Sequence, residues 1–319
     1  MSLVAVTALL LAAFALYAVL GGADFGGGVW DLLATGPRRT AQRAAITHAI
    51  GPVWEANHVW LIFANVILFT CFPVAFAALF TGLYWPLTFA LAGIVLRGAA
   101  FVFRNYAADT RLARYYSVVF GIASLTAPFF FGDAVGALAT GRYAWAQPFA
   151  LAVGLFAVVA CAQIAAVFIL SEIDDDTLRD DFRRRAIRAT LAVWLVGLVP
   201  AGLAALTEPR VFALLHGAAA VPGIAVALLA GLATIACVVT RRNGIARAAV
   251  AIEAAAILAG WFGAQAPDAI PGTLTIAAAA AAGPTLVAFL IAAASGALFL
   301  IPSLVLLFRL FKSTVREPT

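Results

Sequence analysis

Residues 3–33 read LVAVTALLLAAFALYAVLGGADFGGGVWDLL, and this stretch decides the fold class. The run from Leu3 to Leu20 contains no charged side chain, and a membrane-spanning helix needs roughly 20 mainly apolar residues. The start of the chain has no basic segment, and the apolar run passes directly into a glycine-rich polar patch. We therefore expect a retained first transmembrane helix and not a cleaved signal peptide.

The rest of the chain has the same character. Of its 319 residues, 65% are hydrophobic and 11% are charged, whereas soluble domains have about 25% charged residues. The sequence predicts one all-α membrane domain, residues 1–319, with about nine transmembrane helices. The expected spans are 3–33, 51–74, 77–103, 115–138, 147–171, 187–207, 211–240, 245–264 and 284–308. The first and seventh are longer than a bilayer requires, so each should tilt, bend or protrude.

Basic residues indicate the orientation of these spans. Of the 20 Lys and Arg residues, 18 fall on one side of the nine-helix arrangement, and only Arg142 and Arg210 fall on the other. The positive-inside rule makes the first side cytoplasmic, with the N-terminus outside and the C-terminus in the cytoplasm. This distribution explains the net charge of +5 without nucleic acid as a partner. The acidic run 172–181, next to Arg183–Arg185, is expected to form a solvated cytoplasmic hairpin.

The sequence predicts neither a nucleotide-binding module nor a metal site. It contains no Walker motif and no GxGxxG segment after a strand. Cys71, Cys161 and Cys237 lie far apart in apolar stretches, so no disulfide framework is expected. Glu55 and His58 form half of a di-iron signature, but the second copy is missing.

The three histidines also do not predict a haem site in this chain. His48 and His58 are ten residues apart and should point to different helix faces. His216 is expected near the outer side of the membrane, far from both.

Ionisable residues inside a membrane span are costly and are usually paired or functional. In the glycine-rich motif, Gly22 and Gly26 should allow close helix approach. Asp24 lies between them and is a candidate functional residue. Asp31 falls on the same helix face seven residues later, and we expect it to be a solvated residue at the helix end.

Two further groups of polar residues accompany Asp24. Glu55, His58 and Asn65 share one stripe of the second span, where Glu and His three residues apart could transfer a proton. Arg97 and Arg104 share one face at the cytoplasmic end of the third span. They could extend to the membrane interface, or Arg97 could pair with Asp24 or Glu55.

Two further acids within the expected spans are isolated in the sequence. Glu253 falls about halfway through the eighth span and needs a partner, either in this chain or in another subunit. Asp133 falls near the outer end of the fourth span.

Three motifs together resemble subunit II of cytochrome bd-type quinol oxidases: GADFGGG (22–28), GPVWEANHVWLI (51–62) and LRGAAFVFR (96–104). The resemblance covers roughly residues 20–106 at the level of motifs and the whole chain at the level of topology. That family also has nine helices and an external N-terminus. Gly98-Ala99-Ala100 departs from the family's usual Pro-Val-Gly, which puts the local helix geometry in question.

The resemblance implies a respiratory complex of the bacterial cytoplasmic (inner) membrane that oxidises quinol and reduces oxygen to water. Its subunit I carries the quinol site, the b-type haems and haem d, and subunit II pairs with it without binding a cofactor or metal. Asp24, Glu55 and His58 would then form a proton relay from the cytoplasm, with Arg97 as charge partner. The identity of the quinol, a small third subunit, a bound structural quinone, and a partner with only b-type haems are left open. Membrane lipid and quinone are further expected partners.

Two other functions remain open at this point. The chain could be a mainly structural subunit, in which the carboxylates stabilise but do not conduct protons. It could also be a secondary transporter with a binding site at the membrane midplane. Transporters of that kind often contain paired broken helices, and the sequence has one glycine-rich interruption without a counterpart in its second half.

Overall fold

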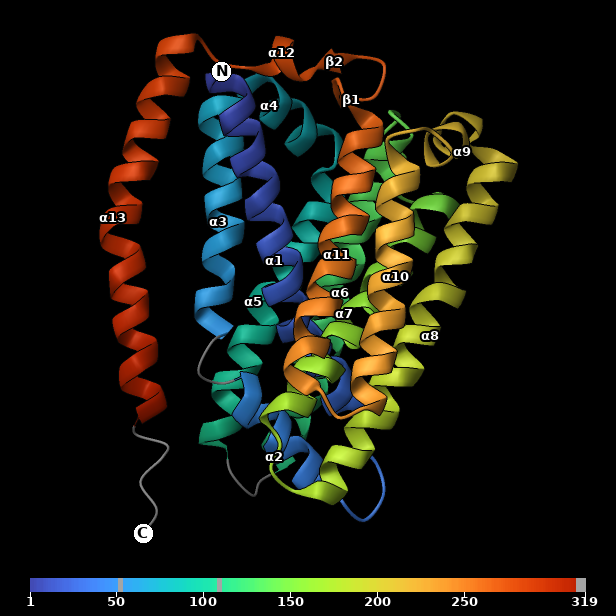
Figure 1. Ribbon diagram of the computed structural model, residues 1–319, viewed down its shortest axis with the longest axis vertical. Coiled ribbons are helices and arrows are strands. Elements are labelled where there is room, and N and C mark those ends of the chain that lie inside the picture. The colour runs from blue at the N-terminus through green and yellow to red at the C-terminus, as the bar shows by residue number, and fades with distance from the viewer. Residues whose placement is uncertain (51–53, 108–110, 314–319) are drawn as a thin grey trace.

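The computed structural model describes residues 1–50, 54–107 and 111–313, and it describes side chains for all of these except residues 50, 54–56, 105, 301, 304–305 and 307–313. The chain is almost entirely helical (Figure 1). The long helices are α1 (Ser2–Leu32), α3 (Trp54–Cys71), α5 (Tyr84–Tyr106), α6 (Arg111–Ala139), α7 (Pro148–Glu172), α8 (Asp176–Thr207), α10 (Ala220–Val239), α11 (Asn243–Gln265) and α13 (Gly283–Ser313). The shorter elements are α2 (Arg39–Ile50), α4 (Pro73–Gly82), α9 (Pro209–Leu215), α12 (Ile276–Ala279) and the strands β1 (Asp268–Ile270) and β2 (Leu274–Thr275).

The all-α polytopic membrane fold is confirmed. Among the described residues, eight helices are long and apolar enough to cross a membrane, and the bent pair α3–α4 makes nine if it counts as one span. Their exposed surfaces are apolar, as lipid contact requires, for example at Phe69 and Leu195.

The chain bends sharply where the sequence predicts two nearly continuous spans, 51–74 and 77–103. The axes of α3 and α4 differ by 118°, and α5 begins only at Tyr84, seven residues later than expected. Pro73 is the first residue of α4, where its missing N–H is tolerated, and it disfavours helical geometry at Phe72. The expected start of the third span was therefore wrong.

The expected long seventh span, 211–240, was also wrong. It consists of the short helix α9 and the spanning helix α10, separated by residues 216–219. Pro222 lies in the first turn of α10, where a missing backbone N–H breaks no helical hydrogen bond. The break explains how so long an apolar run fits a bilayer without an extreme tilt.

The acidic run 172–181 forms the turn and the start of the second arm of a helical hairpin, because α7 ends at Glu172 and α8 already begins at Asp176, and Glu172, Asp174 and Asp176 are exposed. Asp175 is the N-cap of α8, and its side chain accepts a hydrogen bond from the backbone N–H of Leu178 at 2.8 Å. The Thr177 hydroxyl, with that N–H, lowers the pKa of Asp175 below its ordinary value. Capping extends α8 beyond the membrane-spanning length.

The two ends of the bundle differ in charge. We call the end that carries α2 and the first turn of α8 the basic end, and the end that carries α9 and the β1–β2 hairpin the far end (Figure 1). Arg38 directly precedes α2, Arg39 begins it, and Arg183–Arg185 follow the first turn of α8, whereas Arg142 lies in the loop before α7 and Arg210 lies in α9. That the basic end faces the cytoplasm remains a prediction.

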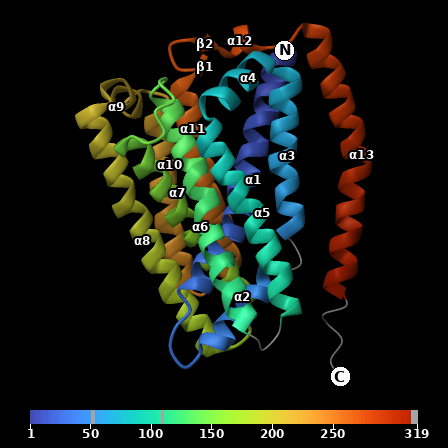
Figure 2. The ribbon, with the colours of Figure 1, turned by 180° about the vertical axis from the view of Figure 1, so that it is seen from behind.

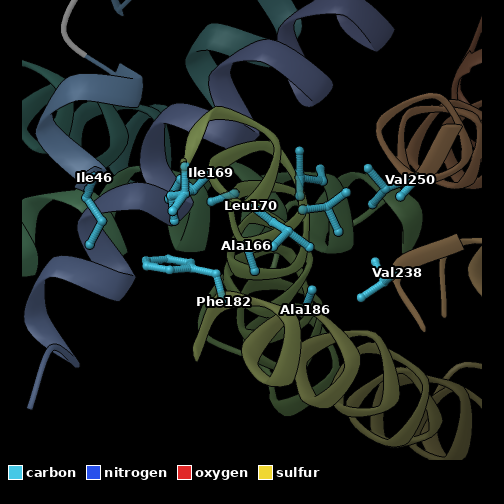
Figure 3. Close-up of a cluster of buried hydrophobic side chains, with 13 residues drawn as sticks. Ile46, Ala166, Ile169, Leu170, Phe182, Ala186, Val238 and Val250 are labelled. Atoms are coloured by element: carbon cyan, nitrogen blue, oxygen red, sulfur yellow. The ribbon is translucent and has the colours of Figure 1, made fainter. Parts of the chain in front are cut away.

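Helix α7 lies at the centre of the bundle and packs against α1, α6, α8 and α11. A large apolar cluster surrounds its second half, with Leu170, Phe182 and Val250 among its buried members (Figure 3). Helix α13 stands apart from the rest of the bundle over most of its length and contacts α1 and α3 (Figures 1 and 2).

Candidate functional site

Glycine brings helix α1 into backbone contact with its neighbours. A Cβ atom on Gly26 would lie 1.9 Å from the Cys161 carbonyl oxygen of α7, and one on Gly28 would lie 2.1 Å from Oγ of Ser124 in α6. No side chain fits at either position. The motif therefore works as a packing surface, and it brings Asp24 of α1 into the centre of the bundle.

Asp24 and Arg97 form an ion pair inside the membrane-spanning region. Nη2 of Arg97 donates to Oδ1 of Asp24 at 2.6 Å, and Nε of Arg97 donates to Oγ of Ser124 at 3.0 Å. The exposed fractions of Asp24 and Arg97 are 2% and 1%. Of the partners that the sequence allows for Arg97, the structure places Asp24 beside it.

A second ion pair lies two helical turns towards the basic end. Nη1 of Arg104 donates to Oδ1 of Asp31 at 3.1 Å, and Nη2 of Arg104 donates to Oγ1 of Thr47 in α2 at 3.1 Å. Arg43 of α2 donates to the backbone oxygen of Asp31. Asp31 is fully buried, so the expectation of a solvated helix-end residue was wrong. The physical reason is that α2 folds over the end of α1.

An aromatic ring lies close to both arginines. The guanidinium carbon of Arg97 is 5.0 Å from the ring centre of Phe120, and that of Arg104 is 4.9 Å from the same ring centre. Phe120 is 1% exposed. Contact with a ring face stabilises a desolvated guanidinium, so Phe120 of α6 compensates part of the cost of burying both charges.

His58 faces Asp24 from α3. Nε2 of His58 lies 3.9 Å from Oδ2 of Asp24, which is longer than a hydrogen bond. Oδ2 of Asp24 and Nδ1 of His58 are buried and have no hydrogen-bond partner among the described residues. Each of these unsatisfied polar atoms marks a place where a proton or a bridging water can be accommodated.

Tyr17 is a site residue that the sequence analysis missed. Its ring centre lies 6.0 Å from that of His58, and its buried hydroxyl has no hydrogen-bond partner among the described residues. Tyr17 precedes Asp24 by seven residues and therefore lies on the same face of α1. That spacing, the same as between Asp24 and Asp31, could have identified it.

The predicted polar stripe of the second span is only partly tested by the structure. The side chain of Glu55 lies outside the described residues, although its backbone belongs to α3. Asn65 donates to the Leu61 carbonyl oxygen in its own helix at 2.9 Å, so it does not extend the cluster around Asp24.

The two isolated acids lie in different surroundings. Glu253 has its partner in the same chain, where Nε2 of Gln163 donates to its Oε2 at 2.6 Å. Both carboxylate oxygens of Asp133 are buried and have no hydrogen-bond partner in the described part of the chain. Neither acid belongs to the Asp24 cluster.

The three histidines lie in three different parts of the structure. No group of three His, Cys, Asp or Glu side chains in the described ranges could hold a metal ion. His48 is exposed on α2, His216 lies near the far end with Nδ1 2.9 Å from the Phe212 carbonyl oxygen, and His58 is packed between aromatic rings beside Asp24. These histidines cannot act together as axial ligands.

Comparison with known proteins assigns the family. The family model described as cytochrome bd terminal oxidase subunit II matches residues 2–311. The chain is similar to the cytochrome bd-I ubiquinol oxidase subunit 2 of Escherichia coli strain K12, with 33% identity over 125 residues, which are 39% of this chain and 32% of that protein. It is also similar to the cytochrome bd ubiquinol oxidase subunit 2 of Bacillus subtilis strain 168, with 32% identity over 113 residues, which are 35% of this chain and 33% of that protein.

The matched segments thus span about a third of these two relatives, whereas the family model spans nearly all of this chain. The glycine-rich helix, the buried ion pairs and the bundle of spanning helices all fall within the matched range. The chain belongs to the cytochrome bd terminal oxidase subunit II family.

Proposed function

We propose that the chain is the second subunit of a terminal oxidase that oxidises quinol and reduces oxygen to water in a bacterial cytoplasmic membrane. Its partner is a haem-bearing subunit I, which holds b-type haems and haem d. Membership of the subunit II family supports this proposal, and so do the names of the relatives. A small third subunit and the identity of the quinol are not part of it.

Within this complex, the chain supplies a proton-input path that starts at the basic end. Asp24, Glu55 and His58 line the path, and Arg97 holds Asp24 in place. The observation that carries the proposal is the pair of unpartnered atoms, Oδ2 of Asp24 and Nδ1 of His58, in a buried cluster. A carboxylate and an imidazole can both accept and release protons near neutral pH when their surroundings favour it.

The geometry supports a division of tasks between the two oxygens of Asp24. Arg97 binds Oδ1, which fixes the side chain and stabilises its negative charge. Oδ2 is free to accept a proton. Because Nε2 of His58 is 3.9 Å away, transfer between the two requires a bridging water or a small side-chain movement.

Oxygen chemistry itself belongs to the haem-bearing subunit I in this proposal. The reduction of oxygen consumes protons, and quinol supplies the electrons, which the haem groups of subunit I would carry to oxygen. The contribution of this chain is to hold and pass protons at Asp24 and His58. This contribution depends only on the positions of the chain's own side chains and needs no bound cofactor.

The test measures quinol-driven oxygen consumption by the purified complex for Glu55→Ala and Asp24→Asn. We expect slower turnover at unchanged haem content, because each change removes a protonatable group. Asp268→Asn is the control, since Asp268 pairs with Arg210 at the far end. Wild-type turnover in both variants would reject the relay and leave the mainly structural role.

A different measurement distinguishes an oxidase subunit from a secondary transporter. Purification of the full chain from its native membrane should yield a complex with haem absorbance and quinol oxidase activity. A chain that is isolated without haem and without oxidase activity would contradict the assignment to an oxidase and return the transporter as the better candidate.

A further inference from the structure

A second buried polar cluster lies in the half of the bundle formed by α7, α8, α10 and α11, outside the site described above. Glu253 and Gln163 are each 2% exposed, and Thr190 is fully buried. Nε2 of Gln163 donates to Oε2 of Glu253 at 2.6 Å and to Oγ1 of Thr190 at 3.2 Å. Three helices, α7, α8 and α11, therefore meet at one carboxyl group.

The carboxyl group of Glu253 differs from those of Asp24 and Asp31 in having no arginine partner in the described part of the chain. Asp24 pairs with Arg97 and Asp31 pairs with Arg104, whereas no ion pair involves Glu253 among the described residues. Gln163, a neutral amide, donates a hydrogen bond to it, and the neutral indole of Trp194 lies beside it. A buried carboxylate without a compensating cation is costly, and such a group lowers its free energy by binding a proton.

Several charged groups of the surrounding helices are engaged elsewhere, and Arg188 of α8 is exposed. On α11 itself, Nη1 of Arg247 donates to Oε1 of Glu172 in α7 at 2.7 Å. On α8, Arg185 donates to Gln42 at 2.7 Å and lies over the ring of Trp30. Helix α10 contains no charged residue, and Arg210 of α9 pairs with Asp268. Asp24 of α1 is paired with Arg97 of α5.

Apolar layers separate this cluster from both ends of the bundle. Towards the basic end lies the cluster of Figure 3, in which Leu170, Ala186 and Val250 follow or precede the polar residues by one or two turns on α7, α8 and α11. Towards the far end lies another buried cluster that includes Phe149 and Ala204, with Trp261 packed against it. No chain of polar side chains reaches Glu253 through these layers in the described residues.

The fourth helix is also in contact with the carboxyl group. A Cβ atom on Gly231 of α10 would lie 2.9 Å from Oε1 of Glu253 and 2.8 Å from the ring of Trp194. Helix α10 thus packs directly onto the acid, which leaves little room for the water that a charged carboxylate would need.

We propose that Glu253 is a permanently occupied proton-binding site: a neutral carboxylic acid, held by Gln163, that joins α7, α8 and α11 and takes no part in proton delivery. The ligand is a single proton. The bound proton neutralises the carboxyl group and so avoids the cost of burying a negative charge within the membrane-spanning region. The site is independent of the proposed relay at Asp24.

The direct test is infrared spectroscopy of the complex that contains the full chain, with glutamate labelled by ¹³C in the side-chain carboxyl group. We expect a band of a protonated carboxylic acid that shifts with the label, disappears in Glu253→Gln, and does not change from mildly acidic to mildly alkaline pH. Glu208→Gln is the control, because Glu208 is ion-paired with Arg142 and should give no such band. The absence of a Glu253-dependent band would overturn the proposal.

Thermal stability gives a second, independent readout. A neutral acid has nearly the shape and polarity of an amide, so Glu253→Gln should keep the wild-type melting midpoint, whereas Glu253→Ala should lower it. A higher midpoint in Glu253→Gln would mean that a buried charge had been removed and would overturn the proposal. If Glu253→Gln does not assemble, Gln163→Leu replaces it: the acid band should move to higher frequency as its carbonyl loses the amide donor, and an unmoved band contradicts the assignment.

Discussion

Oδ1 of Asp24 lies 2.6 Å from Nη2 of Arg97, and seven residues further along both helices Oδ1 of Asp31 lies 3.1 Å from Nη1 of Arg104. Both pairs join α1 to α5 with the same separation of 73 residues. Seven residues are about two turns, or roughly 10 Å of helix. The two helices are thus held in register by one buried and one partly buried ion pair at equal spacing.

The first prediction concerns the energetic coupling of Asp24 and Arg97. Arg97→Gln leaves a buried carboxylate without its cation and should destabilise the protein by about 3–5 kcal/mol. The double variant Asp24→Asn/Arg97→Gln removes both charges, so it should be more stable than Arg97→Gln alone. The measurement is thermal unfolding of the detergent-solubilised protein in a double-mutant cycle.

An exposed ion pair provides the matched control for that cycle. Arg210 and Asp268 lie 3.1 Å apart at the far end, with side-chain exposures of 53% and 23%. Exposed pairs contribute about 0–1 kcal/mol, so Arg210→Gln should change stability little. Strictly additive effects at Asp24 and Arg97 would contradict the inference that the two form one buried unit.

The second prediction concerns the contact between α1 and α7. Gly26→Ala places a methyl group 1.9 Å from the Cys161 carbonyl oxygen, which is backbone and cannot rotate away. The helices must separate, and we expect a loss of at least about 1–3 kcal/mol in stability, or a failure to assemble. Gly202→Ala is the control because nothing lies within 4 Å of its Cβ position. Equal yields of folded protein from both variants would show that the crossing is looser than the structure indicates.

The third prediction concerns Phe120, the ring in contact with both arginines. Phe120→Leu removes two guanidinium–ring contacts while keeping an apolar side chain, and should cost about 1–3 kcal/mol of stability through lost packing and cation–π contact. Phe69→Leu is the comparison, since Phe69 is 65% exposed on α3. The readout is the difference in melting midpoint between the two variants. A Phe120→Leu protein as stable as Phe69→Leu would rule out a stabilising role for the ring.

The sequence predicted the fold class well because membrane spans are determined by local hydropathy, which one chain displays directly. It failed where the structure depends on contacts between distant segments. The burial of Asp31 depends on α2, whose Arg43 and Thr47 cover the end of α1. Residues 39–50 are too polar to predict a spanning helix, so nothing in their composition indicated that they cover α1.

The candidate site shows the same division. A spacing of seven residues could be read from Asp24 to Asp31 and from Arg97 to Arg104, and it indicated shared helix faces. It could not indicate that α1 and α5 pair in this register. Glu253 clearly required a partner, but Gln163 is 90 residues away and uncharged, so nothing in the sequence singled it out.

The last prediction tests which end of the bundle faces the cytoplasm. Single cysteines are introduced at two exposed loop positions, Asp174→Cys at the basic end and Gln147→Cys at the far end. The positive-inside rule predicts that a membrane-impermeant thiol reagent added to intact cells labels Gln147→Cys, and that Asp174→Cys reacts only after the membrane is opened. The unmodified chain is the control, because Cys71 is buried and Cys161 and Cys237 are partly buried. The reverse labelling pattern would show that the basic end faces the outside. The cluster of Asp24 and His58 could then not receive protons from the cytoplasm through the basic end.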